Sequence, residues 1–254
     1  DTVVPSEKTE EELACLMIGA EPPKLEQRAG NPGEPALELL GVGLSGGHHV
    51  TGLSNIRLSV RAGEIVGIAG ISGNGQSRLL GVCMGELPVE QGTVKIFGEV
   101  VNDLDPAERR ARGLRYVPEQ RLGHGSVPEF SLLNNTLLTG DHLHSRGFIN
   151  HEAARRFTEE VIADFDVKTS SVNKAAQALS GGNLQKFIVG REILQKPRVL
   201  IVDQPTWGVD VGAATVIRNA LLKLRGEGAA IVVVSEEIDE LFEISDRIAV
   251  MYRG

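Results

Sequence analysis

Residues 179–185 read LSGGNLQ, and a pattern typical of a helix follows them. Ser180, Gly181 and Gly182 would therefore stand at the start of that helix. Backbone N–H groups, a hydroxyl and the positive end of a helix dipole can together bind an anion. An ordinary helix start offers the same groups, so the segments on either side decide what this one binds.

A magnesium-binding strand is predicted further along the chain, where Asp203 lies 23 residues after Ser180 (203 − 180). Residues 199–203 read VLIVD, an apolar run that ends in the carboxylate of Asp203. A buried strand with this ending can hold Mg²⁺, although any parallel sheet can end a strand in aspartate. The next residue, Gln204, has the shape of glutamate without its charge, so it cannot act as a base.

A phosphate-binding loop is predicted upstream, where residues 70–77 read GISGNGQS between an apolar run and a helical pattern. The template for such a loop is G-x-x-x-x-G-K-[ST], and Gln76 occupies its lysine position. The cation that would neutralise the phosphates is missing, while backbone N–H groups and the Ser77 hydroxyl remain. We expect the phosphate-binding residues to be Gly70, Ser72, Gly73, Asn74, Gly75, Gln76, Ser77 and Arg78.

The three motifs, in this order and at this spacing, resemble those of the ATP-binding-cassette (ABC) family over residues 37–254. The resemblance implies an α/β fold: a P-loop ATPase core with a mainly parallel sheet flanked by helices, an N-terminal antiparallel β part and a small helical subdomain at about residues 122–195. It implies ATP and Mg²⁺ as cofactors, with Ser77 and Asp203 on the metal. The remaining nucleotide contacts that it implies are Ser180, Gly181, Gly182 and Asp210.

Three catalytic positions of the family carry a substitution in this chain. Glu119 stands where the Q-loop glutamine is usual, Gln204 where a glutamate follows the strand aspartate, and Glu236 where the switch histidine is usual. Groups at such positions orient or activate the attacking water and stabilise the transition state. We therefore expect an ABC-type transporter ATPase whose own P-loop site is catalytically impaired, and an isolated chain that is nearly inactive.

One branch of the family is more similar still: the C-terminal cassettes of tandem ABC ATPases that energise bacterial sugar and nucleoside importers. The segments concerned are GNGQS (73–77), VPEQR (117–121), LSGGNLQK (179–186), DQPTWGVDVG (203–212) and SDRIAVM (245–251). This resemblance implies head-to-tail pairing with an upstream cassette of the same polypeptide, whose hydrolytic site LSGGN completes. It also implies transmembrane permease subunits, an indirect link to a solute-binding protein, and a cytoplasmic position on the inner face of the cell membrane. The two glutamines, Gln76 and Gln204, favour the nucleoside-type subset, and the solute that the resemblance implies is a simple sugar or a nucleoside.

Two alternatives remain: a soluble ABC ATPase without a transport role, and a regulatory module that only binds nucleotide. The non-transport enzymes of translation and DNA repair usually carry basic arms or long coiled-coil insertions, which are not visible in this sequence. The net charge of −8, from 34 acidic and 26 basic side chains, argues against a nucleic-acid partner, because phosphate neutralisation needs clustered Lys and Arg.

The first 35 residues differ from the rest, with eight acidic against three basic side chains and five of the 11 prolines. We interpret them as a linker with one short helix, because the capping box at residues 9–12 precedes an apolar stripe of Leu13, Leu16 and Met17. Residues 36–254 would form the cassette, and its end directly after a strand predicts a truncated C-terminus. The two cysteines are far apart and no apolar run is long enough to span a membrane.

Apolar periodicity predicts the remaining elements. Strands are expected at residues 36–42, 56–60, 64–69, 198–203, 229–235 and 247–251, and helices at 76–84, 106–112, 151–165, 181–195, 212–225 and 237–244. Three features of the sequence have more than one interpretation. Trp207 packs either at a dimer interface or over a core. The other two features are a group of histidines and a group of arginines. The histidines His142, His144 and His151 either bind a metal or lie in exposed loops, and the arginines Arg109, Arg110, Arg112, Arg115 and Arg121 are expected on a solvated helix face.

Overall fold

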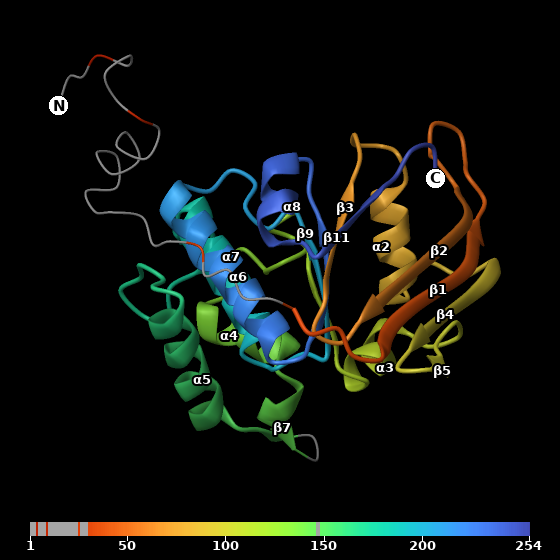
Figure 1. Ribbon diagram of the computed structural model, residues 1–254. Helices are drawn as coiled ribbons and strands as arrows, with labels where there is room; N and C mark the ends of the chain where they lie inside the picture. Colours follow the sequence, from red (N-terminus) through yellow and green to blue (C-terminus); the bar gives the residue numbers. More distant parts are fainter. Residues whose placement is uncertain (1–3, 5–8, 10–24, 26–29, 146–147) are drawn as a thin grey trace.

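The computed structural model describes residues 4, 9, 25, 30–145 and 148–254, so the predicted linker helix lies, except for Thr9, outside the described residues. A parallel sheet forms the centre, with helices on one side and an antiparallel sheet with a further helix on the other (Figure 1). The predicted α/β fold class is confirmed. The longer helices are α2 (Gln76–Met84), α4 (Leu132–Thr139), α5 (His151–Asp164), α6 (Gly181–Ile193) and α7 (Val211–Gly226), and the shorter ones α3 (Pro106–Ala111) and α8 (Ile238–Ile244).

The parallel sheet has the strand order β11-β3-β10-β9-β6. Every residue of its three central strands is buried, as a strand covered on both faces requires. The continuous apolar runs near 64–69, 198–203 and 229–235 are therefore confirmed as buried strands. The five strands are β3 (Ile65–Ala69), β6 (Leu114–Val117), β9 (Val199–Asp203), β10 (Ala230–Val234) and β11 (Arg247–Val250).

Alternate residues of these strands enter two separate cores, because successive side chains of a strand point to opposite faces. Ile65 and Ile231 pack with residues of α6 and α7. Val66 and Val232 pack with residues of α2 and the antiparallel sheet. The helix α2 and the helices α6 and α7 are therefore held on opposite faces of one sheet.

The antiparallel sheet forms the N-terminal β part that was predicted. Its order is β2-β1-β4-β5, and Figure 1 places it beside α2, away from α5 and α6. The strands at 36–42 and 56–60 are confirmed but longer, and β4 was not predicted because four of its six residues remain partly or fully exposed. The four strands are β1 (Pro35–Leu44), β2 (Leu53–Arg61), β4 (Gln91–Ile96) and β5 (Glu99–Val100).

The helices α4 and α5 lie at the opposite end of the molecule and pack against one another and against α6 (Figure 1). All three lie within the residues 122–195 proposed as a helical subdomain, whose limits stay a prediction. The same region contains two short 3₁₀ turns and a small hairpin: Asp141–Leu143, Ala176–Ala178, and the strands β7 (His144–Ser145) and β8 (Phe148–Ile149).

The expectation of a solvated arginine face is wrong for two of its members. Arg109 is fully buried, and its Nη1 donates to the carbonyl oxygens of Val82 at 2.6 Å and Cys83 at 2.8 Å. It thereby binds the C-terminal end of α2, where free carbonyl groups carry partial negative charge. Arg115 is also buried and bonds Asp141 at 3.0 Å. Sequence periodicity could not reveal these distant acceptors.

The histidines make ordinary contacts: the His142 ring meets the Phe157 ring edge-on at 5.0 Å, and His144 Nε2 lies 2.9 Å from the carbonyl oxygen of Leu137. In the part of the chain that the structure describes, no three Asp, Glu, His or Cys side chains are grouped to hold a metal ion. Within the same residues, no helix has the length and apolar character of a membrane span.

Candidate functional site

The loop between β3 and α2 has the backbone of a phosphate cradle. Gly73 and Gly75 adopt φ angles of 86° and 108°, in the left-handed region that favours glycine. Gly75 is the N-cap of α2, so the first N–H groups of that helix have no helical acceptor. The Thr51 hydroxyl donates to the Gly73 carbonyl oxygen at 2.7 Å and ties the loop to the segment just before β2.

Gln76, at the lysine position of the loop, is turned back on the loop itself. It is 7% exposed, and its Nε2 donates to the carbonyl oxygen of Ile71 at 3.1 Å. The side chain therefore stabilises the loop and brings no positive charge to it. Ser77 follows as an exposed residue in the first turn of α2, while Arg78 donates to the carbonyl oxygen of Ser45 at 2.7 Å.

A buried carboxylate and two exposed ones gather at the carboxyl ends of β9, β10 and β6. Asp203 is 8% exposed, whereas Glu119 and Glu236 face solvent. Burial, followed by the negative charges of Glu119 and Glu236, raises the pKa of Asp203 to about 7. A positive ion beside Asp203 would relieve this repulsion, and a single carboxylate oxygen is a ligand that suits a hard divalent cation that keeps several waters.

Gln204 is held in a strained conformation between the two central strand ends. Its φ of 51° is unusual for a residue other than glycine. Its N–H donates to the Val234 carbonyl oxygen at 2.8 Å, and its Oε1 accepts from the Glu236 N–H at 3.2 Å. Backbone strain of this kind gathers at functional sites, and here it keeps an uncharged amide where the family has a carboxylate.

Glu240 is a site residue that sequence analysis missed. It is 1% exposed on α8, and its two carboxylate oxygens accept from the hydroxyls of Thr206 and Ser235, each at 2.7 Å. The segments that follow β9 and β10 are therefore bound to one carboxylate. Its only signal in the sequence was a polar residue in the first turn of a predicted helix.

The motif at 179–185 forms a second helix start, as predicted. Ser180 is the N-cap of α6, and the Asn183 side chain donates to its hydroxyl at 2.8 Å. A Cβ atom on Gly182 would lie 3.1 Å from Asp210 Oδ2, so a side chain at this position would crowd the Asp210 carboxylate. Asp210 is itself the N-cap of α7 and accepts from the Ala213 N–H at 2.8 Å, which brings two helix N-termini together.

The two helix starts, at Gly75 and at Ser180, lie in different surroundings. The neighbours of Gly75 are Met251, Gly254 and Gly52, whereas those of Gly181 are Arg121 and Gly208. Among the described residues, no hydrogen bond or ion pair joins residues 70–78 to residues 179–183. The two helix starts are therefore not in direct hydrogen-bond contact with each other within the chain.

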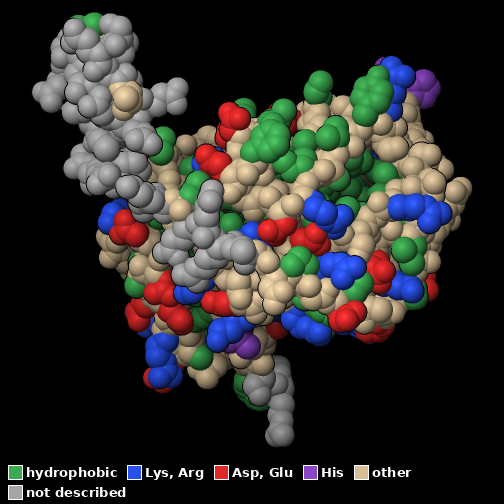
Figure 2. Space-filling model, in the orientation of Figure 1, with side chains coloured by type: hydrophobic (Ala, Val, Ile, Leu, Met, Phe, Trp, Pro, Cys, Tyr) green, Lys and Arg blue, Asp and Glu red, His purple; other side chains and the backbone are tan. Residues whose placement is uncertain are grey.

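The surface near these loops carries exposed apolar side chains. Trp207 is 54% exposed, so it does not cap a core, and Phe242 is 72% exposed. Figure 2 shows hydrophobic side chains gathered along the upper edge of the molecule, over α8 and the end of β3. Apolar patches of this kind mark interaction surfaces, as the dimer-interface alternative for Trp207 requires.

Residues 53–207 match the profile of the ABC transporter family. The guanosine import ATP-binding protein NupO of Bacillus subtilis (strain 168) is 37% identical over 249 residues, which is 96% of this chain and 49% of that protein. The glucose import ATP-binding protein TsgD13 of Haloferax volcanii is 38% identical over 259 residues, 100% of this chain and 47% of that protein. The chain thus spans about half the length of these curated relatives.

Among solved structures, the dimeric ATP-binding cassette MJ0796, described as a post-hydrolysis state bound to ADP and Pi, superposes with a TM-score of 0.75 and 28% identity. The superposition covers 86% of this chain and 95% of the MJ0796 chain. A nucleotide-free ATP-binding cassette superposes with a TM-score of 0.73, covering 87% of this chain and 89% of that one, and at 22% identity this likeness concerns the fold.

Proposed function

The chain belongs to the ABC transporter family, and from this premise we propose that it is a nucleotide-binding domain of an importer. It binds ATP with Mg²⁺ and pairs head to tail with a second cassette. The observation that carries the proposal is an unequal pair of loops: the motif around Ser180 is complete, whereas the loop around Gln76 has lost its charge. The two composite nucleotide sites of the pair are then unequal as well.

At its own P-loop site, the chain binds phosphate mainly through its backbone. The N–H groups at residues 73–77 and the start of α2 attract phosphate oxygens. The Ser77 hydroxyl and the Asp203 carboxylate would hold Mg²⁺, which supplies positive charge to the phosphates when bound. Gln204 orients water without accepting a proton, and Glu236 adds negative charge where the family has a histidine. The site holds nucleotide and hydrolyses it poorly.

At the partner's site, the chain supplies the closing surface. Ser180 and the N–H groups of Gly181 and Gly182 face the γ-phosphate of a nucleotide bound by the partner's P-loop. Hydrolysis proceeds at the partner's site, because the groups that this chain supplies to it match the family motif. The partner is an upstream cassette of the same polypeptide, which agrees with the half-length match to the import proteins.

The proposed partners of the paired cassettes are permease subunits in the membrane. A solute-binding protein delivers the solute to these subunits. The chain would then lie in the cytoplasm, on the inner face of the membrane. Two relatives are named as the ATP-binding proteins of guanosine import and glucose import, so a nucleoside or simple sugar is the proposed solute class. A cassette without a transport role is the alternative, and the presence of permease genes beside the full gene separates the two.

The purified chain tests the impaired site. We expect calorimetry to detect weak binding of Mg-ATP and Mg-ADP, together with no ATP turnover above background. Asp203→Asn is the control for metal-dependent chemistry at this site. Robust turnover by the chain that Asp203→Asn abolishes would contradict the proposal, and so would the complete absence of nucleotide binding.

A further inference from the structure

Arg121 is the last residue of the VPEQR segment (117–121). It lies two residues after Glu119, at the start of a compact turn over residues 121–126. The Ser126 hydroxyl donates to the carbonyl oxygen of Arg121 at 2.8 Å, and the Gly125 N–H donates to that of Gln120 at 2.9 Å. The backbone of Arg121 is therefore fixed before its side chain makes any contact.

The guanidinium of Arg121 joins α6 to the loop that follows β9. Its Nε donates to Gln185 Oε1 at 3.1 Å, and its Nη2 donates to the carbonyl oxygen of Trp207. Gln185 is fully buried on α6 and in turn donates to the carbonyl oxygen of Pro205 at 2.9 Å. Two side chains thus hold residues 205–207 against the first turns of α6. We call α6 the signature helix, and the LSGG segment at its start (residues 179–182) the signature.

The same guanidinium lies directly beside the signature glycines. A Cβ atom on Gly181 would lie 2.9 Å from Arg121 Nη1, and one on Gly208 would lie 3.6 Å from Nη2. Among the described residues, no carboxylate forms an ion pair with Arg121. Its acceptors are neutral oxygens on two separate segments, which only a forked donor can bridge at once.

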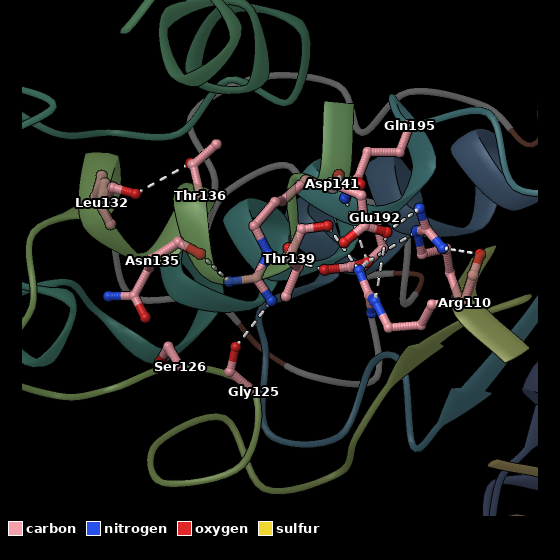
Figure 3. Close-up of polar contacts among 12 residues, drawn as sticks. Arg110, Gly125, Ser126, Leu132, Asn135, Thr136, Thr139, Asp141, Glu192 and Gln195 are labelled. Atoms are coloured by element: carbon pink, nitrogen blue, oxygen red, sulfur yellow. Dashed lines mark hydrogen bonds and ion pairs between the residues drawn. The ribbon is translucent and has the colours of Figure 1, made fainter. Parts of the chain in front are cut away.

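The turn over residues 121–126 is also bound to the far end of α6. Arg191 is 3% exposed, and it donates to the carbonyl oxygens of Gly125 at 3.0 Å and Asn135 at 3.1 Å. Its neighbour Glu192 is fully buried and bonds Arg191 Nε at 2.9 Å. Figure 3 shows Gly125, Asn135 and Glu192 around this junction of α4, α6 and the turn. The turn is therefore hydrogen-bonded to the C-terminal half of α6.

We propose that Arg121 is a positioning residue that sets the signature loop of this cassette, at Ser180–Gly182, against the loop at residues 205–208. This geometry decides whether the signature meets the partner's γ-phosphate at hydrogen-bond distance. In this role Arg121 would act through the two loops and not through a contact with nucleotide. The inference rests on the proposed head-to-tail pairing, and one of its two tests does not depend on that pairing.

The first test uses hydrogen exchange on the purified chain. Replacing Arg121 by lysine keeps the charge and removes the fork, so residues 179–185 and 205–210 lose a shared constraint. We expect their amide hydrogens to exchange at least about tenfold faster in Arg121→Lys, while those of α5 exchange as before. Unchanged exchange in both loops would overturn the proposal, and so would a uniform rise across the chain.

The second test uses the complete transporter that contains this chain, with ATP turnover measured over a range of ATP concentrations. We expect Arg121→Lys and Arg121→Ala to lower kcat at least about tenfold, with KM for ATP changed less than about threefold. Arg112→Ala, which removes a surface arginine paired with Glu99 at 2.7 Å, is the matched control and should behave as the unaltered protein.

Two outcomes of this second test contradict the positioning role: normal kcat in both Arg121 variants, or a raised KM with normal kcat. Gly182→Asp in the same assay separates the two levels of inference. If Gly182→Asp abolishes turnover and the Arg121 variants do not lower it, the positioning role fails alone. If Gly182→Asp has no effect, the proposed function fails.

Discussion

The helices α6 and α2 both begin at a glycine-rich turn, yet the side chains around the two turns differ. At α6, the N-cap Ser180, both glycines and the neighbouring guanidinium of Arg121 are in place. At α2, the glycine geometry is retained, but Gln76, Gln204 and Glu236 replace side chains that carry charge or protons in the family. Backbone architecture and catalytic charge are therefore separable in one domain.

This difference indicates a division of labour. Binding of phosphate at a helix N-terminus depends on backbone N–H groups, which survive the substitutions at α2. Hydrolysis depends on charges and proton acceptors placed around the transition state, and these do not survive. Under the proposed function, the chain would lose turnover at its own loop and still complete the site of its partner.

The largest effect should come from restoring the lost charges together. The variant Gln76→Lys, Gln204→Glu, Glu236→His returns a cation, a base and a proton carrier to the P-loop site. Because two copies can then pair through their intact signatures, we expect ATP turnover of the purified chain to rise at least about 100-fold. The same triple variant with Gly182→Asp should stay at background. No gain in the triple variant would mean that the backbone of this loop is not competent.

A smaller effect should follow from the lysine alone. Gln76→Lys adds one charge-assisted contact, worth about 1.5–3 kcal/mol in typical cases, so Mg-ATP should bind about ten- to 100-fold more tightly. Calorimetry on the purified chain measures this. Glu99→Gln is a distant control that should leave affinity unchanged. Equal affinity in Gln76→Lys and the original chain would show that the loop does not cradle phosphate.

Proton release should report the metal ligand. Because the pKa of Asp203 is raised to about 7, close to half of this group is protonated at pH 7, and a divalent cation would displace the proton. We expect about half a proton to be released when Mg-ATP binds at pH 7, and much less at pH 8.5. Calorimetry in buffers of different ionisation enthalpy measures the release. Asp203→Asn should abolish it, and a release that persists in that variant comes from another group.

A last effect concerns stability without nucleotide. The folded chain binds the Asp203 proton up to about pH 7, whereas the unfolded chain releases it near the ordinary aspartate pKa of 3.8. The raised pKa therefore makes the free energy of unfolding fall as pH rises between these values. Denaturant titrations of Asp203→Asn should show a shallower fall over this window. An equal slope in both proteins would contradict the raised pKa.

Patterns in the sequence predicted the elements whose side chains are all buried, and the helix starts that glycine or serine marks. The strands β3, β9 and β10 and the helices α2 and α6 belong to this group. Half-exposed β4 was not predicted, and the eight-residue α4, which contains two asparagines, was not predicted either, because their apolar patterns are short.

Contacts between distant segments could not be predicted from the sequence. Arg109 is buried because carbonyl groups at the end of α2, more than 20 residues away, accept its hydrogen bonds. Arg121 and Glu240 likewise act through acceptors or donors on other elements. The candidate site residues were predicted by motif spacing, whereas the side chains that hold these motifs in place emerge from the fold alone.

We propose that ATP hydrolysis in the complete transporter depends more on the signature of this cassette than on its own P-loop. One paired measurement tests this directly. ATP turnover and solute uptake are compared for Gly182→Asp and Gln76→Ala in the complete transporter, in membranes with matched expression. Gly182→Asp places a side chain and a negative charge where a Cβ would already lie 3.1 Å from Asp210, so both activities should fall to near background. Gln76→Ala should keep a substantial fraction of both. Equal damage by the two substitutions would contradict the account.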